Sequence, residues 1–177
     1  HEIEPVKSVA GEREADDFLL YWAFTALLLQ GLLTAVPTAR ARRLEPWTRN
    51  LASHARNNLH KVRGAIKRLR AFEAIYHAQF DHLDVLLSPT ATAPAPEIGV
   101  LRPDQSFEQK RDKLLRLLPY TPVQNIAGAP GISVPAGKTD GGLPIGVQLA
   151  GPKGGERRLL ELAFALESGG SLPQGPI

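Results

Sequence analysis

The fold is decided by three stretches of the chain: DVLLSP at residues 84–89, GISVP at 131–135 and LPIGVQL at 143–149. The first contains Val85–Leu87, a short apolar run stopped by a Ser-Pro breaker, which predicts a buried strand. The second predicts another strand, and the third predicts a strand with alternating apolar residues. Because Thr139–Gly142 supplies turn residues between the last two, we expect them to pair as an antiparallel hairpin.

Helices are predicted around these strands. Thr90–Pro103 contains three prolines and is expected to be an extended loop. Ser106 and Gln109 form a capping box that opens a helix, and Pro119 must end it. After the hairpin a Gly-Gly pair leads into a last helix, for which Gly169 is a natural carboxy-terminal cap. The residues expected on the buried side of that helix are Leu159, Leu160, Ala163, Phe164 and Leu166.

The first half of the chain is predicted to be mainly helical. A short strand at Ile3–Val9 is followed by acidic residues at Glu12–Asp17, which suit the first turn of a helix that continues to about Leu33. A second long helical pattern covers Leu51–Leu83. Its apolar stripe consists of Leu59, Val62, Ile66, Leu69, Phe72, Tyr76, Phe80 and Leu83. The chain therefore divides into a mainly helical part (1–83), a part with strands, hairpin and terminal helix (84–168) and a tail (169–177).

The first long helix also raises the question of a membrane span. No charged residue occurs between Phe18 and Ala39, and three arginines follow, so the stretch passes a simple test for a spanning helix. Polar residues such as Thr25, Gln30 and Thr34 interrupt it, however. A helix that is apolar all round is equally typical of the interior of a large protein. We therefore favour a buried or pocket-lining helix over a membrane anchor.

Composition excludes some classes of function. The 177 residues have the length of one domain and include no cysteine, which excludes disulfides and thiolate chemistry and agrees with a cytoplasmic location. The net charge is +3, but the segment Arg40–Arg70 holds ten basic residues against Glu45, so it carries +9 and the remainder −6. Such a segment can attract an anionic partner, which makes a non-catalytic binding module the alternative function. No aromatic residues alternate with these charges to stack bases, which favours a solvated helix face.

Most of the other polar groups are interpreted as structural. Ser133 lies in the middle of a predicted strand, without a Ser-Ser pair or a G-x-S-x-G elbow. Glu73, His77 and Asp81 share a helix face by their spacing, but solvent-facing helices show the same spacing, so no metal site is predicted. Gly151–Gly155 precedes a helix without matching the phosphate-loop pattern, which favours a strand-to-helix turn.

The polar segment Tyr120–Asn125 is the most interesting candidate for a site. Several hydrogen-bonding groups cluster there, between a helix and a Gly-Ala-Pro-Gly turn, and glycines let a backbone approach a ligand closely. The same segment would also serve as scaffold, with Asn125 capping the turn. From the residues alone, the two interpretations are equal.

Taken in order, the motifs between Asp84 and Glu167 resemble the carboxy-terminal part of an amidase signature hydrolase. The resemblance rests on Ser88-Pro-Thr90, on Thr-x-x-x-Asn-x-x-Gly-x-Pro at 121–130, on Ser133-Val-Pro135 and on Leu143-Pro-Ile-Gly-Val-Gln148. It implies an α/β fold class, as the carboxy-terminal part of a mixed β-sheet flanked by helices. It also implies that the parent enzyme hydrolyses a carboxamide C–N bond through a Ser-cisSer-Lys triad and needs no cofactor.

The triad of that family has no counterpart in these residues, so the resemblance implies no catalytic residue in this chain and a triad upstream. It implies that Thr121, Asn125 and Ile126 line the substrate pocket and that Gly128 and Pro130 shape the loop. The chain is then expected to support the pocket, to complete the sheet and to be inactive alone. Its expected partners are the missing amino-terminal part of the enzyme and a small amide substrate, with self-association as a further outcome. Metal, nucleic acid and membrane partners are not expected.

Overall fold

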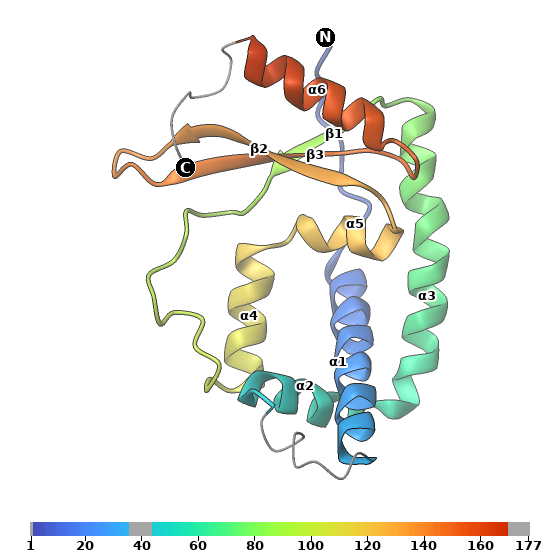
Figure 1. Cartoon of the computed structure of the whole chain (residues 1–177). Helices are drawn as coiled ribbons and strands as arrows, with labels where there is room; N and C mark the ends of the chain where they lie inside the picture. The colour runs from blue at the N-terminus through green and yellow to red at the C-terminus, as the bar shows by residue number, and fades with distance from the viewer. Residues whose placement is uncertain (1, 36–43, 170–177) are drawn as a thin grey trace.

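The computed structural model describes residues 2–35 and 44–169. Outside this part lie three arginines of the basic segment (Arg40, Arg42 and Arg43) and residues 170–177 of the predicted tail. In chain order the elements are α1 (Glu12–Ala35), α2 (Pro46–Asn57), α3 (Leu59–Ala78), the 3₁₀ turn η2 (Gln79–Asp81), β1 (Leu86–Pro89), α4 (Phe107–Leu117), α5 (Thr121–Ala127), β2 (Gly131–Lys138), β3 (Pro144–Ala150) and α6 (Glu156–Ser168). Helices α1 to α4 form a lower body, and the sheet lies above it between α5 and α6 (Figure 1).

The described sheet has three antiparallel strands in the order β1-β3-β2. The predicted hairpin is confirmed as β2 and β3, with a register shift between Pro135 and Gly137. One face of the sheet packs against α6 through a core of Val134, Leu149, Leu159 and Ala163. The other face lies toward α5, since Leu86 of β1 packs with the cluster that contains Ala127 of α5. The predicted α/β class, with helices flanking a sheet, is confirmed.

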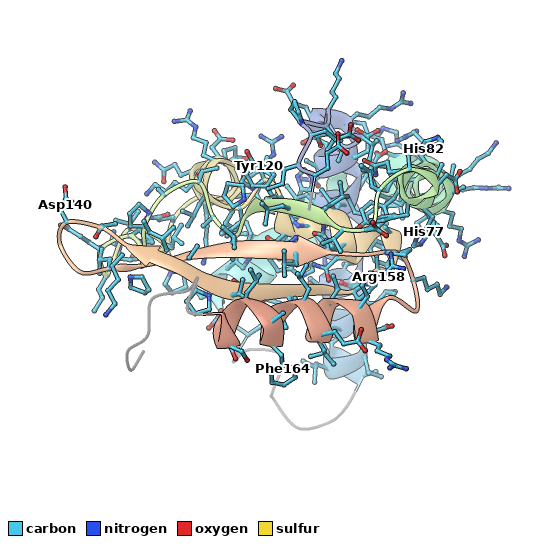
Figure 2. All side chains as sticks on the ribbon, turned by 90° about the horizontal axis from the view of Figure 1, so that it is seen from above. His77, His82, Tyr120, Asp140, Arg158 and Phe164 are labelled. Atoms are coloured by element: carbon cyan, nitrogen blue, oxygen red, sulfur yellow. The ribbon has the colours of Figure 1, made fainter. Side chains whose placement is uncertain are left out.

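Two burial predictions in this half of the chain were wrong. The apolar run of β1 was expected to be buried, but Leu87 is 56% exposed, because β1 has a neighbouring strand on one side only among the described residues. On α6, Leu160 and Phe164 were expected on the buried side, but they are 49% and 65% exposed. Figure 2 shows the reason: α6 meets the sheet with one side, and Phe164 points away from the strands.

The helical body is built on apolar contacts of α1. Leu19, Ala23 and Ala26 of α1 form a core cluster with Trp47 and Leu51 of α2 and with Ala55, against which Phe107 of α4 packs. The Trp47 and Phe107 rings stack at 5.6 Å between centroids, and the His54 ring stacks on Phe107 at 4.2 Å. Partial burial, with the nearby Arg111 charge, lowers the pKa of His54 below its ordinary value. These contacts hold α4 across the end of α2.

The second long helix of the sequence pattern is in fact two helices that meet at Asn58. Asparagine is a poor helix former because its side chain competes for backbone groups, and here Asn58 Nδ2 donates to the His54 carbonyl at 2.9 Å. The break lets α2 and α3 take different directions against α1. The predicted strand at Ile3–Val9 is also wrong: no strand is described there, and Val9 packs instead on the Phe72–Tyr76 cluster.

The apolar helix α1 ends at Ala35 in the described part of the chain. It is the one helix among the described residues that is long and apolar enough to cross a membrane, and 22% of its apolar window is buried. Its Asp17 is buried and forms two 2.6 Å hydrogen bonds with Arg68 of α3. Much of the helix is exposed within the described residues, with Leu28 56% and Leu32 66% exposed, so the buried or pocket-lining helix stays a prediction.

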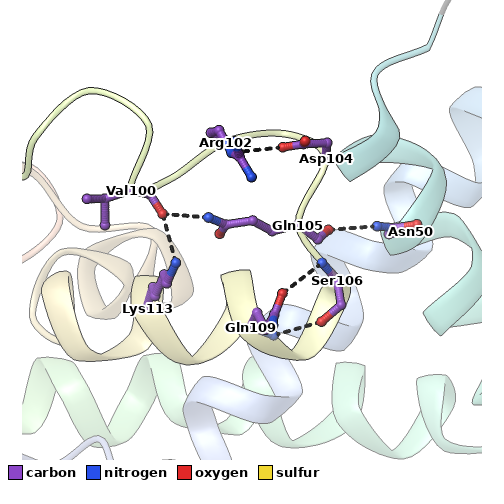
Figure 3. A network of polar contacts seen from close by, with 8 residues as sticks. All are labelled: Asn50, Val100, Arg102, Asp104, Gln105, Ser106, Gln109 and Lys113. Atoms are coloured by element: carbon purple, nitrogen blue, oxygen red, sulfur yellow. Dashed lines mark hydrogen bonds and ion pairs between the residues drawn. The ribbon is translucent and has the colours of Figure 1, made fainter.

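The segment before α4 is fixed by a polar network (Figure 3). Gln105 Nε2 and Lys113 Nζ both donate to the Val100 carbonyl, at 2.8 and 3.0 Å. The predicted capping box is confirmed, since Ser106 Oγ accepts from the Gln109 backbone N–H at 3.2 Å and the Gln109 side chain accepts from the Ser106 N–H. These contacts fix where α4 begins.

The ion pair between α1 and α3 gives a stability prediction. Arg68→Ala leaves the buried Asp17 carboxylate without its partner, and we expect the free energy of unfolding to fall by about 1–3 kcal/mol. The expectation is near the lower end for a buried pair because the Arg68 side chain is itself partly exposed to water. Urea unfolding of both forms measures the difference.

The matched control is Arg157→Ala, which removes an exposed i,i+4 pair with Glu161 on α6. A change of no more than about 0.5 kcal/mol is expected there. Equal losses in the two variants would contradict a special role for the α1–α3 pair.

Candidate active-site scaffold

The polar segment that follows Pro119 was expected to be a loop but forms the short helix α5. Pro122 lies in its first turn, where proline needs no amide hydrogen and has a suitable φ. The helix ends at Gly128, which has φ 61° in the left-handed region, and the Gly128 N–H donates to the Gln124 carbonyl. Glycine adopts this conformation without the steric penalty of a side chain. A proline start and a glycine end were present in the sequence and would have predicted this helix.

Gly128 gives a second stability prediction. In Gly128→Ala the new Cβ meets no neighbour within 4 Å, but φ stays at 61°. We therefore expect the free energy of unfolding to fall by about 1–2 kcal/mol from backbone strain alone. The control is Gly31→Ala in α1, which also has open space around the new Cβ. Because Gly31 lies at a helical position with ordinary φ, Gly31→Ala should raise the free energy of unfolding by about 0.5–1 kcal/mol. Thermal or urea unfolding of both variants checks the opposite signs.

The structure separates the predicted pocket residues into two groups. Thr121 and Asn125 lie one helical turn apart, and Asn125 Nδ2 donates to the Thr121 carbonyl at 3.3 Å. Asn125 is exposed, and its Oδ1 makes no hydrogen bond within the described residues. Ile126 packs instead against the buried cluster of Phe72, Tyr76 and Ala127. Pro130 connects α5 to the sheet, because its carbonyl accepts from the Gly151 N–H at 3.2 Å.

Hydroxyl and amide groups gather on the sheet face opposite α6. Ser88, Gln148 and Ser133 occupy one row across β1, β3 and β2. Thr90 lies beside Gly146 of the central strand, and its hydroxyl reaches over that glycine to the Ser133 hydroxyl at 2.7 Å. A Cβ on Gly146 would be 3.0 Å from both oxygens. A glycine is therefore needed at this point for the two edge strands to share a hydrogen bond.

Gln124 connects α5 to this polar face and was not identified from the sequence. In the amide orientation that satisfies both of its polar atoms, Gln124 Oε1 accepts from Gln148 Nε2 at 3.2 Å. In the same orientation its nitrogen donates to the Tyr120 and Thr121 carbonyls at 3.0 and 3.3 Å. Gln148 is buried. No local pattern joins residues 124 and 148, so sequence reasoning had no signal for this pair.

The hydroxyls of this face have no base beside them in the described part of the chain. Ser133 Oγ contacts the Thr90 hydroxyl, which does not take up a proton at neutral pH, whereas a nucleophilic serine needs an adjacent base. Two of the residues weighed for a metal site contact Lys153: its Nζ lies 3.3 Å from the Glu73 carboxylate, and its N–H donates to His77 Nδ1 at 3.5 Å. Within the described residues Ser133 therefore lacks the neighbouring base that a nucleophile needs.

Comparison with known proteins gives the family. A family model described as amidase matches residues 2–160, which is most of the chain. The chain belongs to the amidase family. AmiC of Mycobacterium tuberculosis, which is named as an amidase, is 40% identical over 154 residues, covering 86% of this chain and 32% of that protein. A glutamyl-tRNA(Gln) amidotransferase component from Bdellovibrio bacteriovorus is 39% identical over 136 residues, covering 76% of this chain and 26% of that protein.

Solved structures agree with this family. A 6-aminohexanoate cyclic dimer hydrolase superimposes with a TM-score of 0.71 and 27% identity, over 89% of this chain and 35% of that one. A bacterial aryl acylamidase of the amidase signature family superimposes with a TM-score of 0.65 at 18% identity, over 90% of this chain and 34% of that one, which shows a shared fold. The amidase chain described here spans about a third of the length of the curated relatives that it matches. The predicted resemblance is confirmed, and the predicted cytoplasmic location stays a prediction.

Proposed function

We propose that this chain is the carboxy-terminal part of an amidase that hydrolyses the C–N bond of a carboxamide. The family match over residues 2–160 carries the proposal. The names of the matched proteins support the same chemistry, because amidase, amidotransferase and cyclic dimer hydrolase all describe reactions at an amide bond.

In this proposal the nucleophile is a serine of the upstream polypeptide, with a second serine and a lysine beside it. Its hydroxyl attacks the amide carbonyl and gives up its proton, and the C–N bond breaks as ammonia or an amine leaves with that proton. Water then hydrolyses the acyl-serine ester and restores the hydroxyl. The present chain contributes no group to these bond changes. Its part is to bind and orient the substrate.

The binding role is assigned to the exposed polar side of α5. Thr121 offers a hydroxyl, and Asn125 offers Oδ1 and its second N–H, which suit the N–H and carbonyl groups of a carboxamide. Ile126 supports the site from the core side, and Gly128 and Pro130 shape the connection to β2. The missing amino-terminal part of the enzyme is the proposed partner, and self-association is expected when it is absent.

The experiment is to compare amide hydrolysis by this chain alone with hydrolysis by the same chain joined to the upstream polypeptide. Release of ammonia or amine from simple carboxamides is expected only from the joined protein. In the joined protein, Asn125→Ala should raise KM, since it removes a substrate contact and no reacting group. Turnover by the separate chain would contradict the proposal.

The alternative of an anionic-partner module receives no support. Of the basic segment, Arg68 is paired with Asp17, and Arg56 donates to Gln30 Oε1 at 3.0 Å. Nearby, Arg111 of α4 pairs with Asp16. Acidic partners therefore neutralise Arg68 and Arg111 on this side of α1.

A further inference from the structure

Two buried or partly buried glutamines lie where the short helix α5 meets the sheet. Gln148 comes from β3, on the same row as Ser88 and Ser133, and it is buried. Gln124 comes from the middle of α5, and its amide meets the Gln148 amide. Gly131 of β2 lies below both: a Cβ there would be 3.6 Å from Gln124 Cγ and 3.8 Å from Gln148 Cδ. The contact therefore joins the helix, the central strand and an edge strand.

The Gln124 amide also contacts the first turn of α5. When Gln148 Nε2 donates to Gln124 Oε1, the Gln124 nitrogen faces the Tyr120 and Thr121 carbonyls. The Thr121 carbonyl also accepts from Asn125 Nδ2 at 3.3 Å. The orientation of one amide thus decides the hydrogen bonding around Thr121.

The helix needs this support because it is short. A seven-residue helix is not stable without tertiary contacts. Its second half is held by Ile126 and Ala127, which pack on Phe72 and Tyr76. Among the described residues, its first half has no comparable apolar anchor beyond Val123, so the amide contact is the main polar connection between that end and the sheet.

We infer that Gln124 and Gln148 form a positioning pair, which fixes the first turn of α5 and so holds Thr121 and Asn125 in place for a carboxamide substrate. The inference rests on the proposed substrate-binding role of those two residues. Neither glutamine touches the reacting atoms: each acts through α5. The pair should therefore affect substrate binding more than the chemical step.

The test uses the joined protein with Gln124→Met, Gln148→Met and both together. Methionine keeps the length and volume of glutamine and removes its hydrogen bonds. Backbone amides of α5 should exchange with solvent about five to ten times faster in each single variant, the change expected for one lost hydrogen bond. Because the two residues act as a pair, the double variant should exchange no faster than the single ones.

Kinetics on the same variants separate positioning from simple support of the fold. KM for a carboxamide should rise about five- to tenfold while kcat changes less than about twofold, which is the pattern of lost ground-state binding. Gln105→Met is the control: it breaks a similar amide-to-carbonyl bond, to Val100, at the opposite end of α4. It should leave both α5 exchange and KM unchanged.

Three results would overturn the inference: unchanged α5 exchange, additive effects in the double variant, or faster exchange with unchanged KM. If the joined protein has no amidase activity, the proposed function fails, and the exchange data still decide whether the two glutamines position α5. The two failures are therefore distinguishable.

Discussion

We expect this chain alone to hydrolyse amides on the order of 10⁶-fold more slowly than the same chain joined to the upstream polypeptide. That is the typical loss of rate when a serine nucleophile or its base is removed. The expectation follows from the described hydroxyls, none of which has a base beside it: Ser133 contacts the Thr90 hydroxyl. The matched part is about a third of AmiC, so that relative contains many residues beyond those matched here. The measurement is release of ammonia or amine over time from a panel of simple carboxamides.

A variant of the joined protein with its nucleophilic serine changed to alanine is the control for contaminating hydrolases. It should be as inactive as the separate chain. Ser133→Ala in the joined protein provides the matched comparison within this chain. It should keep most of the activity, because the Ser133 hydroxyl bridges strands and has no base beside it in the described residues. Loss of all activity in Ser133→Ala would show that the nucleophile had been placed in the wrong part of the enzyme.

Tyr76→Ala is expected to lower the free energy of unfolding by about 3–5 kcal/mol, the range for removing a large aromatic side chain from a core. Tyr76 is 0% exposed and lies where α3, α5 and the sheet meet. Its ring is 5.3 Å from that of Phe80, and its hydroxyl donates to the Gly151 carbonyl at 3.3 Å. Since domains are stabilised by about 5–15 kcal/mol, this single change approaches the whole stability. Urea unfolding measures it.

Ile75→Ala is the neighbouring control, since Ile75 is apolar but 54% exposed on the same helix. Its effect should stay within about 0.5 kcal/mol. Tyr76→Phe keeps the ring and should lose about 0.5–1.5 kcal/mol for its hydrogen bond. Equal effects of Ile75→Ala and Tyr76→Ala would contradict the packing that the structure shows around Tyr76.

Alkaline pH offers an independent test of the buried hydroxyl. Burial raises the pKa of Tyr76 above its ordinary value of 10.0, so the folded chain holds this proton more tightly than the unfolded chain. Its contribution to stability is complete below pH 10 and falls as the pH rises above that value. In Tyr76→Phe this part of the pH dependence should disappear.

Local rules in the sequence predicted the features that depend on neighbouring residues. The capping box of Ser106 and Gln109, the β2–β3 hairpin and the glycine-rich turn before α6 are all present. Each is decided by backbone torsions and hydrogen bonds within a few residues. The resemblance to amidases rested on the same kind of evidence, ordered motifs, and it was confirmed.

The wrong predictions concern contacts between distant parts of the chain. The apolar pattern of α6 gave no means to tell Leu159, which meets the sheet, from Leu160, which does not. The single helix predicted for Leu51–Leu83 ran across the break at Asn58, where the Asn58 side chain bonds to the His54 carbonyl. In both cases periodicity indicates which residues can be buried, and the packing partner decides which are.

The sequence by itself determined the family, most of the helices and strands and the hairpin, because these depend on torsional preferences and hydrogen bonds among neighbours along the chain. Tertiary structure alone decided that Gln124 meets Gln148, that Tyr76 reaches Gly151 and that two hydroxyls share a bond above Gly146. Each of those contacts joins residues at least 24 positions apart, and side chains so distant are brought together by burial of the apolar surfaces around them.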